Sequence, residues 1–215
     1  MAASPGSLAG LAVAWLAYGL VHSLLADRRL KARIVGRWPG AARAYRLAYN
    51  GLAVVLLAGP LALTRALRGP PLWDWPGAWG WLADGLAAAA LAVFLWSLRY
   101  YDLGVFLGLR QWREGAADPD GPQAFRLSPL HRFVRHPWYS CALVLIWTRD
   151  WDPAWLVTAA ALTAYIWVGL RLEEAKLETA FGDAYRRYRA RVPALLPRPW
   201  RYLDRAQACT LGGPG

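Results

Sequence analysis

The sequence predicts an all-α protein, a polytopic membrane helical bundle of about five transmembrane helices with a C-terminal cytoplasmic amphipathic helix. Of its 215 residues, 57% are hydrophobic and only 18% are charged, whereas about a quarter of the residues in soluble domains are charged. The mean hydropathy is positive, at +0.19. Several apolar runs also approach the ~20 residues that a helix needs to cross a bilayer.

The expected spans are five apolar segments. The first ends in polar and basic residues and not in a small-residue cleavage site, so we expect a retained span and not a signal peptide. The fourth covers only about half of a ~30 Å hydrocarbon core unless earlier residues join its helix. The turn "RDWDP" (149–153) follows it, so the fourth and fifth segments should form an antiparallel hairpin. The segments are 8–26, 47–64, 79–98, 139–148 and 154–172.

A different period begins after the fifth segment. Apolar and aromatic residues recur there at steps of three and four with charged residues between them, which predicts an amphipathic helix on the cytoplasmic face. Pro193 should end this helix. We expect one integral-membrane domain over residues 1–200 and a disordered tail over 201–215. The recurring residues are Leu177, Phe181, Tyr185, Tyr188 and Val192.

The net charge of +11 comes from 25 basic and 14 acidic residues. The basic residues cluster between apolar runs and do not cover one soluble surface, so nucleic-acid binding is not expected. The positive-inside rule puts the N-terminus outside and the C-terminus in the cytoplasm. The Ala-, Arg-, Gly- and Pro-rich usage favours a bacterium, hence its inner membrane. Cys141 and Cys209 form no disulfide framework and lack metal-ligand spacing, so no metal is expected.

Polar residues collect at the cytoplasmic ends of the predicted hairpin. His136 and Tyr139 open the fourth segment, and Arg171, Glu173 and Glu174 close the fifth. Adjacent antiparallel helices bring these ends to the same depth. Consecutive glutamates point about 100° apart, so at least one faces inward. Carboxylates at a helix C-terminus meet an unfavourable dipole, which a nearby cation would offset. The simpler interpretation, in which these residues only mark the lipid interface, stays open at this point.

The C-terminal third resembles a known signature. "RHPWY" (135–139), a hairpin and then "EEAKLETAFGDAYRRYRARVPALLP" (173–197) resemble the motif of the integral-membrane methyltransferases, which include isoprenylcysteine carboxyl methyltransferase and phospholipid N-methyltransferases. "VHSLLADRRLK" (21–31), "YRLAYNGLAVV" (45–55) and "DLGVFLGLRQ" (102–111) resemble the bacterial methanethiol S-methyltransferase-like branch. The chain departs from the family pattern at Cys141 and Pro129, where glycine is usual.

The resemblance implies S-adenosyl-L-methionine as cofactor, bound by residues 128–200 on the cytoplasmic side. It implies a small lipophilic thiol of the methanethiol or hydrogen sulfide type as methyl acceptor. Arg171 could lower the pKa of that thiol, or His22 could take its proton. A structural role for His22, bonded to a backbone carbonyl in the bundle, is the alternative. The implied cofactor-binding residues are His136, Pro137, Tyr139, Glu173 and Glu174.

Three alternatives stay open. The methyl acceptor could be a prenylcysteine carboxylate or a phospholipid amine. Sterol-reductase-like NADPH oxidoreductases share an Arg-His motif, although Pro137 and the Glu173–Glu174 pair argue against that class. A non-catalytic membrane component could keep the site without turnover. The sequence does not define the oligomeric state.

Overall fold

The computed structural model describes residues 3–115, 125 and 127–212. Within these ranges the chain is helical and contains no β-strand, only two isolated bridges, which confirms the all-α prediction. The elements are α1 (Pro5–Leu25), α2 (Arg28–Arg37), α3 (Ala41–Ala66), α4 (Ala78–Ser97), η1 (Leu98–Tyr100), α5 (Leu103–Leu107), α6 (Leu109–Glu114), η2 (Pro129–Arg132), α7 (Pro137–Trp147), α8 (Pro153–Arg191) and α9 (Arg205–Gly212).

Four helices of the described chain are long and apolar enough to cross a membrane: α1, α3, α4 with η1, and α8. Only 11% to 22% of their most apolar stretches is buried inside the protein. Leu16 and Val54, for example, are 71% and 69% exposed. Such a continuous apolar surface fits a lipid environment, so the predicted membrane bundle is confirmed. The fourth predicted segment forms α7, whose 11 residues extend about 16 Å, half of the hydrocarbon core as expected.

The helices form two compact units. The first contains residues 3–74, 102–115 and 150–162, and the second contains 75–101, 125, 127–149 and 163–212. Helix α8 begins in the first unit and continues in the second. The expectation of one domain over residues 1–200 stays a prediction.

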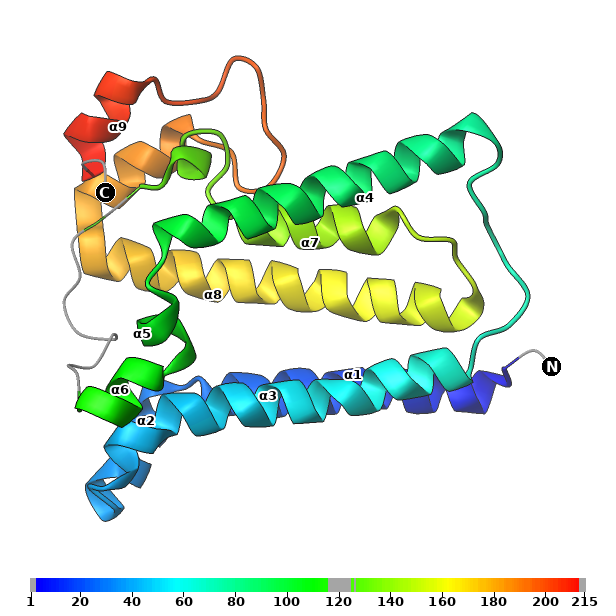
Figure 1. Ribbon diagram of the computed structural model, residues 1–215, viewed down its shortest axis with the longest axis horizontal. Coiled ribbons are helices and arrows are strands. Elements are labelled where there is room, and N and C mark those ends of the chain that lie inside the picture. Colours follow the sequence, from blue (N-terminus) through cyan, green and yellow to red (C-terminus); the bar gives the residue numbers. More distant parts are fainter. Residues whose placement is uncertain (1–2, 116–124, 126, 213–215) are drawn as a thin grey trace. The chain divides into compact units, whose positions relative to one another are not determined.

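The first unit is held by apolar contacts and one neutral hydrogen-bond chain. Helices α1 and α3 run side by side (Figure 1). Trp15 Nε1 donates to Thr158 Oγ1 at 3.0 Å, and the Thr158 and Thr64 hydroxyls lie 2.7 Å apart. Thr64 donates to the carbonyl of Pro60 at 2.7 Å. The side chains of Trp15, Thr158 and Thr64 are therefore linked by hydrogen bonds of the kind that join helices in lipid.

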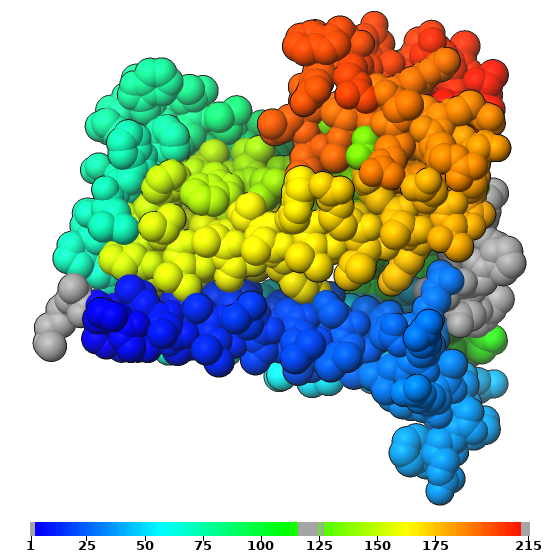
Figure 2. Space-filling view, turned by 180° about the vertical axis from the view of Figure 1, so that it is seen from behind, coloured from blue at the N-terminus to red at the C-terminus, as the bar shows by residue number. Residues whose placement is uncertain are grey.

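A glycine permits the close approach of α5 and α6 to α3. Gly108 has φ +90°, and a Cβ atom there would lie 2.6 Å from the backbone nitrogen of Leu47. Asn50 Nδ2 donates to the carbonyls of Phe106 and Leu107 at 3.1 Å each. The same unit carries the basic helix α2, whose segment projects beyond the end of α1 (Figure 2).

In the second unit, α4 packs along α7 (Figure 1). Trp138 at the start of α7 donates from Nε1 to Ser97 Oγ at 2.8 Å, and its ring centroid lies 4.6 Å from that of Tyr101. Helix α8 departs from helical geometry at Gly182, with φ 52° and ψ −125°. The range of α8 therefore joins two helices across a kink at Gly182, and the second of them ends before Pro193, as predicted.

The expectation of disorder over 201–215 is wrong for the residues up to 212. Leu203 is fully buried and its N–H donates to the carbonyl of Arg132 at 2.9 Å. Helix α9 follows, with Ala208 also buried. Both join a core with Tyr185, Tyr188 and Val192, and the orange-to-red residues gather in one lobe (Figure 2). The prediction was based on the composition of the tail itself, and this does not indicate packing against residues that are distant in the sequence. Residues 213–215 lie outside the described range.

Candidate active site

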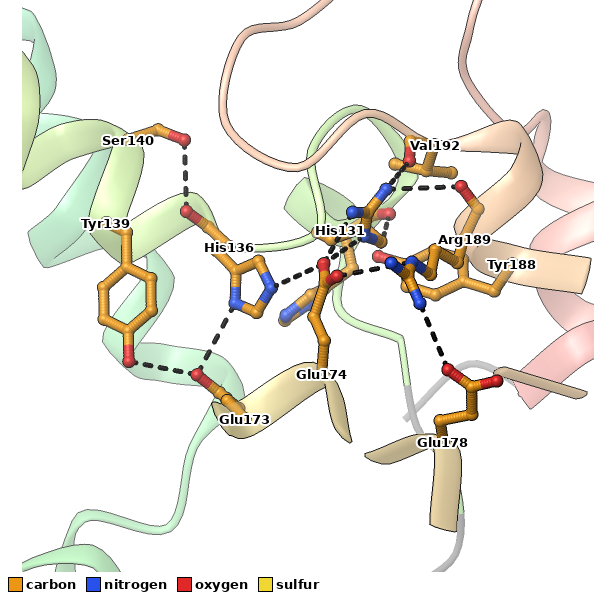
Figure 3. A network of polar contacts seen from close by, with 11 residues as sticks. His131, His136, Tyr139, Ser140, Glu173, Glu174, Glu178, Tyr188, Arg189 and Val192 are labelled. Carbon is orange, nitrogen blue, oxygen red and sulfur yellow. Dashed lines mark hydrogen bonds and ion pairs between the residues drawn. The ribbon is translucent and has the colours of Figure 1, made fainter. Parts of the chain in front are cut away.

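The start of α7 and the part of α8 around Glu173 meet in a cluster of polar side chains (Figure 3). His136 precedes α7, and the buried Pro137 is the first helical residue, where its missing N–H costs no hydrogen bond. His136 Nε2 lies 3.2 Å from Glu174 Oε1, and its Nδ1 lies 3.5 Å from Glu173 Oε2. Tyr139 Oη donates to Glu173 Oε2 at 3.0 Å. The structure therefore brings together these five sequence-predicted residues, two from α8 and three around the start of α7.

Glu174 is buried and fully paired. It is 3% exposed, and its Oε1 accepts from Arg135 Nη2 at 2.6 Å and from Arg135 Nε at 2.7 Å. Arg189 Nε lies 3.4 Å from Glu174 Oε2. Arg189 also reaches Glu178 at 3.1 Å. A buried carboxylate is tolerated only with such compensation, so these two arginines supply the cation expected near the α8 carboxylates.

Arg135 also ties the start of α7 to the end of α8. Its Nη1 donates to the carbonyl of Val192 and, at 3.2 Å, to that of Arg189. The first carbonyl directly follows α8 and the second lies in its last turn, where a positive charge is stabilised by the helix dipole. One guanidinium therefore serves both the Glu174 carboxylate and the helix end.

The segment after Pro193 holds the His136 backbone. Arg135 N–H donates to Pro193 O at 2.9 Å, and His136 N–H donates to Ala194 O at 3.0 Å. The Ser140 hydroxyl donates to Leu195 O at 2.6 Å. This pairing explains why the Val-Pro-x-x-x-Pro element accompanies the Arg-His-Pro motif: it orients the imidazole.

Glu173 differs from its neighbour because its side chain is 47% exposed. The contacts described above join Glu173 to the Tyr139 hydroxyl and the His136 imidazole. The rings of His136 and Tyr139 are stacked, with their centroids 5.4 Å apart and their planes at 13° to each other. An imidazole can donate to both glutamates only in its protonated form. A half-exposed carboxylate beside a phenol and an imidazole matches the ammonium end of a zwitterionic ligand. This donor set fits S-adenosyl-L-methionine.

Sequence reasoning missed His131, which lies behind Glu174 in the same cluster (Figure 3). Ser128 N–H donates to His131 Nδ1 at 3.3 Å. The pKa of His131 is lowered to about 4, mainly by burial and also by the charge of His136, while the charge of Glu173 opposes the change. The Ser-x-x-His spacing just before the motif was the available signal. Arg135 and Arg189 were also missed as site residues.

The structure does not bring Arg171 or His22 into this cluster by any contact it describes. Arg171 is exposed, with its guanidinium carbon 4.6 Å from the centroid of the Trp167 ring. His22 belongs to the first unit, where its Nε2 lies 2.9 Å from Tyr49 Oη. Their catalytic roles stay predictions. Cys141 is buried within α7, in agreement with a packing role.

Comparison with curated proteins finds methanethiol S-methyltransferases. Methanethiol S-methyltransferase 2 of Bradyrhizobium diazoefficiens is 34% identical over 149 residues, which are 67% of this chain and 58% of that protein. A Pseudomonas methanethiol S-methyltransferase is 35% identical over 60% of this chain and 50% of its own length. That of Crocosphaera subtropica is 29% identical over 84% of this chain and 71% of its own.

The chain spans about half the length of the first curated relatives it matches, 58% and 50% in the two cases above. No family model matches the sequence. No solved structure matches it either. The identities of these three relatives to this chain are 29% to 35%. These similarities confirm the predicted resemblance to the methanethiol S-methyltransferase-like branch.

Proposed function

We propose that the protein is an integral-membrane, S-adenosyl-L-methionine-dependent methyltransferase that methylates the sulfur of a small lipophilic thiol. The observation that carries this proposal is the pairing of an exposed carboxylate, Glu173, with Tyr139 and His136 beside a second, buried carboxylate. The similarity to proteins named methanethiol S-methyltransferase supports the same acceptor class.

The two glutamates have different roles in this proposal. Glu173 binds the ammonium group of the cofactor, because it is the carboxylate with room for another partner. Glu174 is a positioning residue that holds His136 through Nε2 and is itself held by Arg135. Tyr139 donates to Glu173 and orients it. The bound cofactor supplies an electrophilic methyl group on a sulfonium.

The chain's remaining task is to hold the acceptor sulfur in line and to handle its proton. Correct alignment of two reactants can supply much of a displacement reaction's acceleration. A thiol becomes nucleophilic as its thiolate, so a cation near it or a base is required. Arg171 on α8 and the His22–Tyr49 pair of the first unit are the candidates. Loss of turnover with retained cofactor binding in Arg171→Ala or His22→Ala would identify which one acts.

The test is methyl transfer by the purified full-length chain in detergent. Labelled S-adenosyl-L-methionine is offered with methanethiol, hydrogen sulfide, a longer alkyl thiol, a prenylcysteine and a phospholipid amine. We expect label on the small thiols and at least tenfold less on the others (about 1.4 kcal/mol of discrimination). If label is transferred only to the prenylcysteine or only to the phospholipid amine, the acceptor is that compound and not a small thiol. Binding of reduced nicotinamide without binding of the methyl donor would overturn the proposal.

We also propose that this site faces the cytoplasm of a bacterial inner membrane, with the N-terminus outside, because the basic loops share one side under the positive-inside rule. Cys209 on α9 is exposed, whereas Cys141 is buried. A membrane-impermeant thiol reagent should therefore label Cys209 only after the cells are permeabilised. Cys209→Ser provides the control for labelling at Cys141. Labelling of Cys209 in intact spheroplasts would reverse the orientation.

A further inference from the structure

The imidazole of His131 has a fixed hydrogen-bonding state. The Ser128 N–H donates to Nδ1 at 3.3 Å, and the Ser128 hydroxyl lies 2.7 Å from the same nitrogen. A ring nitrogen that accepts from a backbone N–H carries no hydrogen itself, so the neutral ring carries its hydrogen on Nε2. The carbonyl of His131 accepts from Tyr188 Oη at 2.8 Å, which fixes the main chain as well. His131 thus presents one N–H donor from a rigid position.

His131 lies in the same polar cluster as His136 and Glu174 (Figure 3). The charges of His136 and Glu173 both act on the His131 ring, and its pKa is lowered to about 4, mainly by burial. The ring is therefore neutral at physiological pH and donates without competing as a cation for Glu173. Tyr101 is a second neutral donor nearby: burial raises the pKa of its hydroxyl, a hydrogen bond with Ser128 opposes this, and the charge of Glu173 adds to it.

We propose that His131 Nε2–H binds the carboxylate of the methyl donor, next to the ammonium group bound by Glu173. This inference rests on the proposed function. The ammonium and carboxylate of the methionyl part are carried by one carbon atom, so a donor adjacent to Glu173 is within reach of the carboxylate. A hydrogen bond to an ionised acceptor is about twice as strong as a neutral one. A protonated His131 would instead pair with Glu173 and exclude the ammonium.

The test compares two methyl donors on the same protein, S-adenosyl-L-methionine and its decarboxylated form, which keeps the ammonium and the sulfonium. Affinities are measured by calorimetry on the full-length chain in detergent near neutral pH. His131→Asn keeps a short polar group that can meet Ser128 but removes the donor at Nε2. His131→Gln extends an amide N–H to about that position. The Asn variant should bind S-adenosyl-L-methionine about tenfold or more weakly.

The decarboxylated compound should bind the Asn variant as well as it binds the unaltered protein, and the Gln variant should recover part of the lost affinity. The ratio of the two affinities within one variant does not depend on the fraction of protein that is folded. An unchanged ratio in both variants would overturn the assignment of His131. If the unaltered chain binds neither compound, the proposed function itself fails and this inference fails with it.

Discussion

The two units bury polar side chains in different ways. In the first, Trp15, Thr158 and Thr64 form a chain of neutral hydrogen bonds that ends on a backbone carbonyl. In the second, Arg135 and Arg189 enclose the Glu174 carboxylate. Neutral hydroxyls between membrane helices satisfy one another and hold the helices together. Charges near the membrane are expensive and are kept where they serve a ligand or a reaction. We infer that the first network is structural and that the second supports a binding site.

The sharpest way to break this comparison is to remove a buried charge. Arg135→Ala leaves Glu174 without its closest cation and the α8 carbonyls without their donor. Because an uncompensated buried charge is costly, we expect a loss of about 3–5 kcal/mol in the free energy of unfolding, measured by denaturation in detergent. Arg205→Ala, at the exposed start of α9, is the matched control and should change stability by less than about 0.5 kcal/mol. Equal stability of the two variants would refute the role of Arg135.

The second effect depends on pH and on His131. Its folded-state pKa of about 4 lies below the ordinary value of 6.5. Below pH 6.5 the unfolded chain therefore binds a proton that the folded chain excludes, so stability falls as the pH drops from 6.5 towards 4 and is flat with respect to this group above 6.5. The full loss is about 3 kcal/mol.

Unfolding midpoints measured across this range, for the unaltered chain and for His131→Phe, isolate that contribution. The variant should lose the part of the pH dependence that His131 causes. If the unfolding midpoints of both proteins depend on pH in the same way between pH 4 and 6.5, another group causes the pH dependence.

The smallest effect is expected in the neutral network. Thr158→Val keeps the side-chain shape but removes the acceptor for Trp15 Nε1 and the hydroxyl partner of Thr64. Hydrogen bonds between membrane helices contribute about 1 kcal/mol or less, so we expect a loss of that size. Binding of S-adenosyl-L-methionine should be unchanged, since Thr158 belongs to the structural network. A loss of cofactor affinity together with a normal unfolding midpoint would erase the distinction between the two networks.

Much of the fold follows from the sequence. Apolar run length predicts the helices that became α1, α3, α4 and the first part of α8, because lipid demands about 20 apolar residues per span. The hairpin turn at 149–153 was enough to predict that His136 and Glu173 would meet. These features depend on residues that are close together in the sequence, so they can be predicted from the sequence alone.

The rest depends on contacts between distant residues. The break at Gly182 turns the chain so that Arg189 reaches Glu174, and no periodicity indicates the direction after such a break. The burial of Leu203 requires Arg132 as a partner, 71 residues earlier. His131 lies outside the motif and is recognised only by its contact with Ser128. The sequence also did not indicate which arginines compensate the Glu174 charge, because Arg135 and Arg189 are distant from it in the sequence.

The central claim is that Glu173, the exposed member of the pair, binds the ammonium group of the methyl donor. Calorimetric binding of S-adenosyl-L-methionine to the unaltered chain, to Glu173→Gln and to the control Asp84→Asn, an exposed carboxylate paired with Arg149, tests it most directly. We predict binding by the first and the third, with affinity reduced about tenfold or more in Glu173→Gln. Equal affinity in all three proteins, or loss in the Asp84 control alone, would contradict the account.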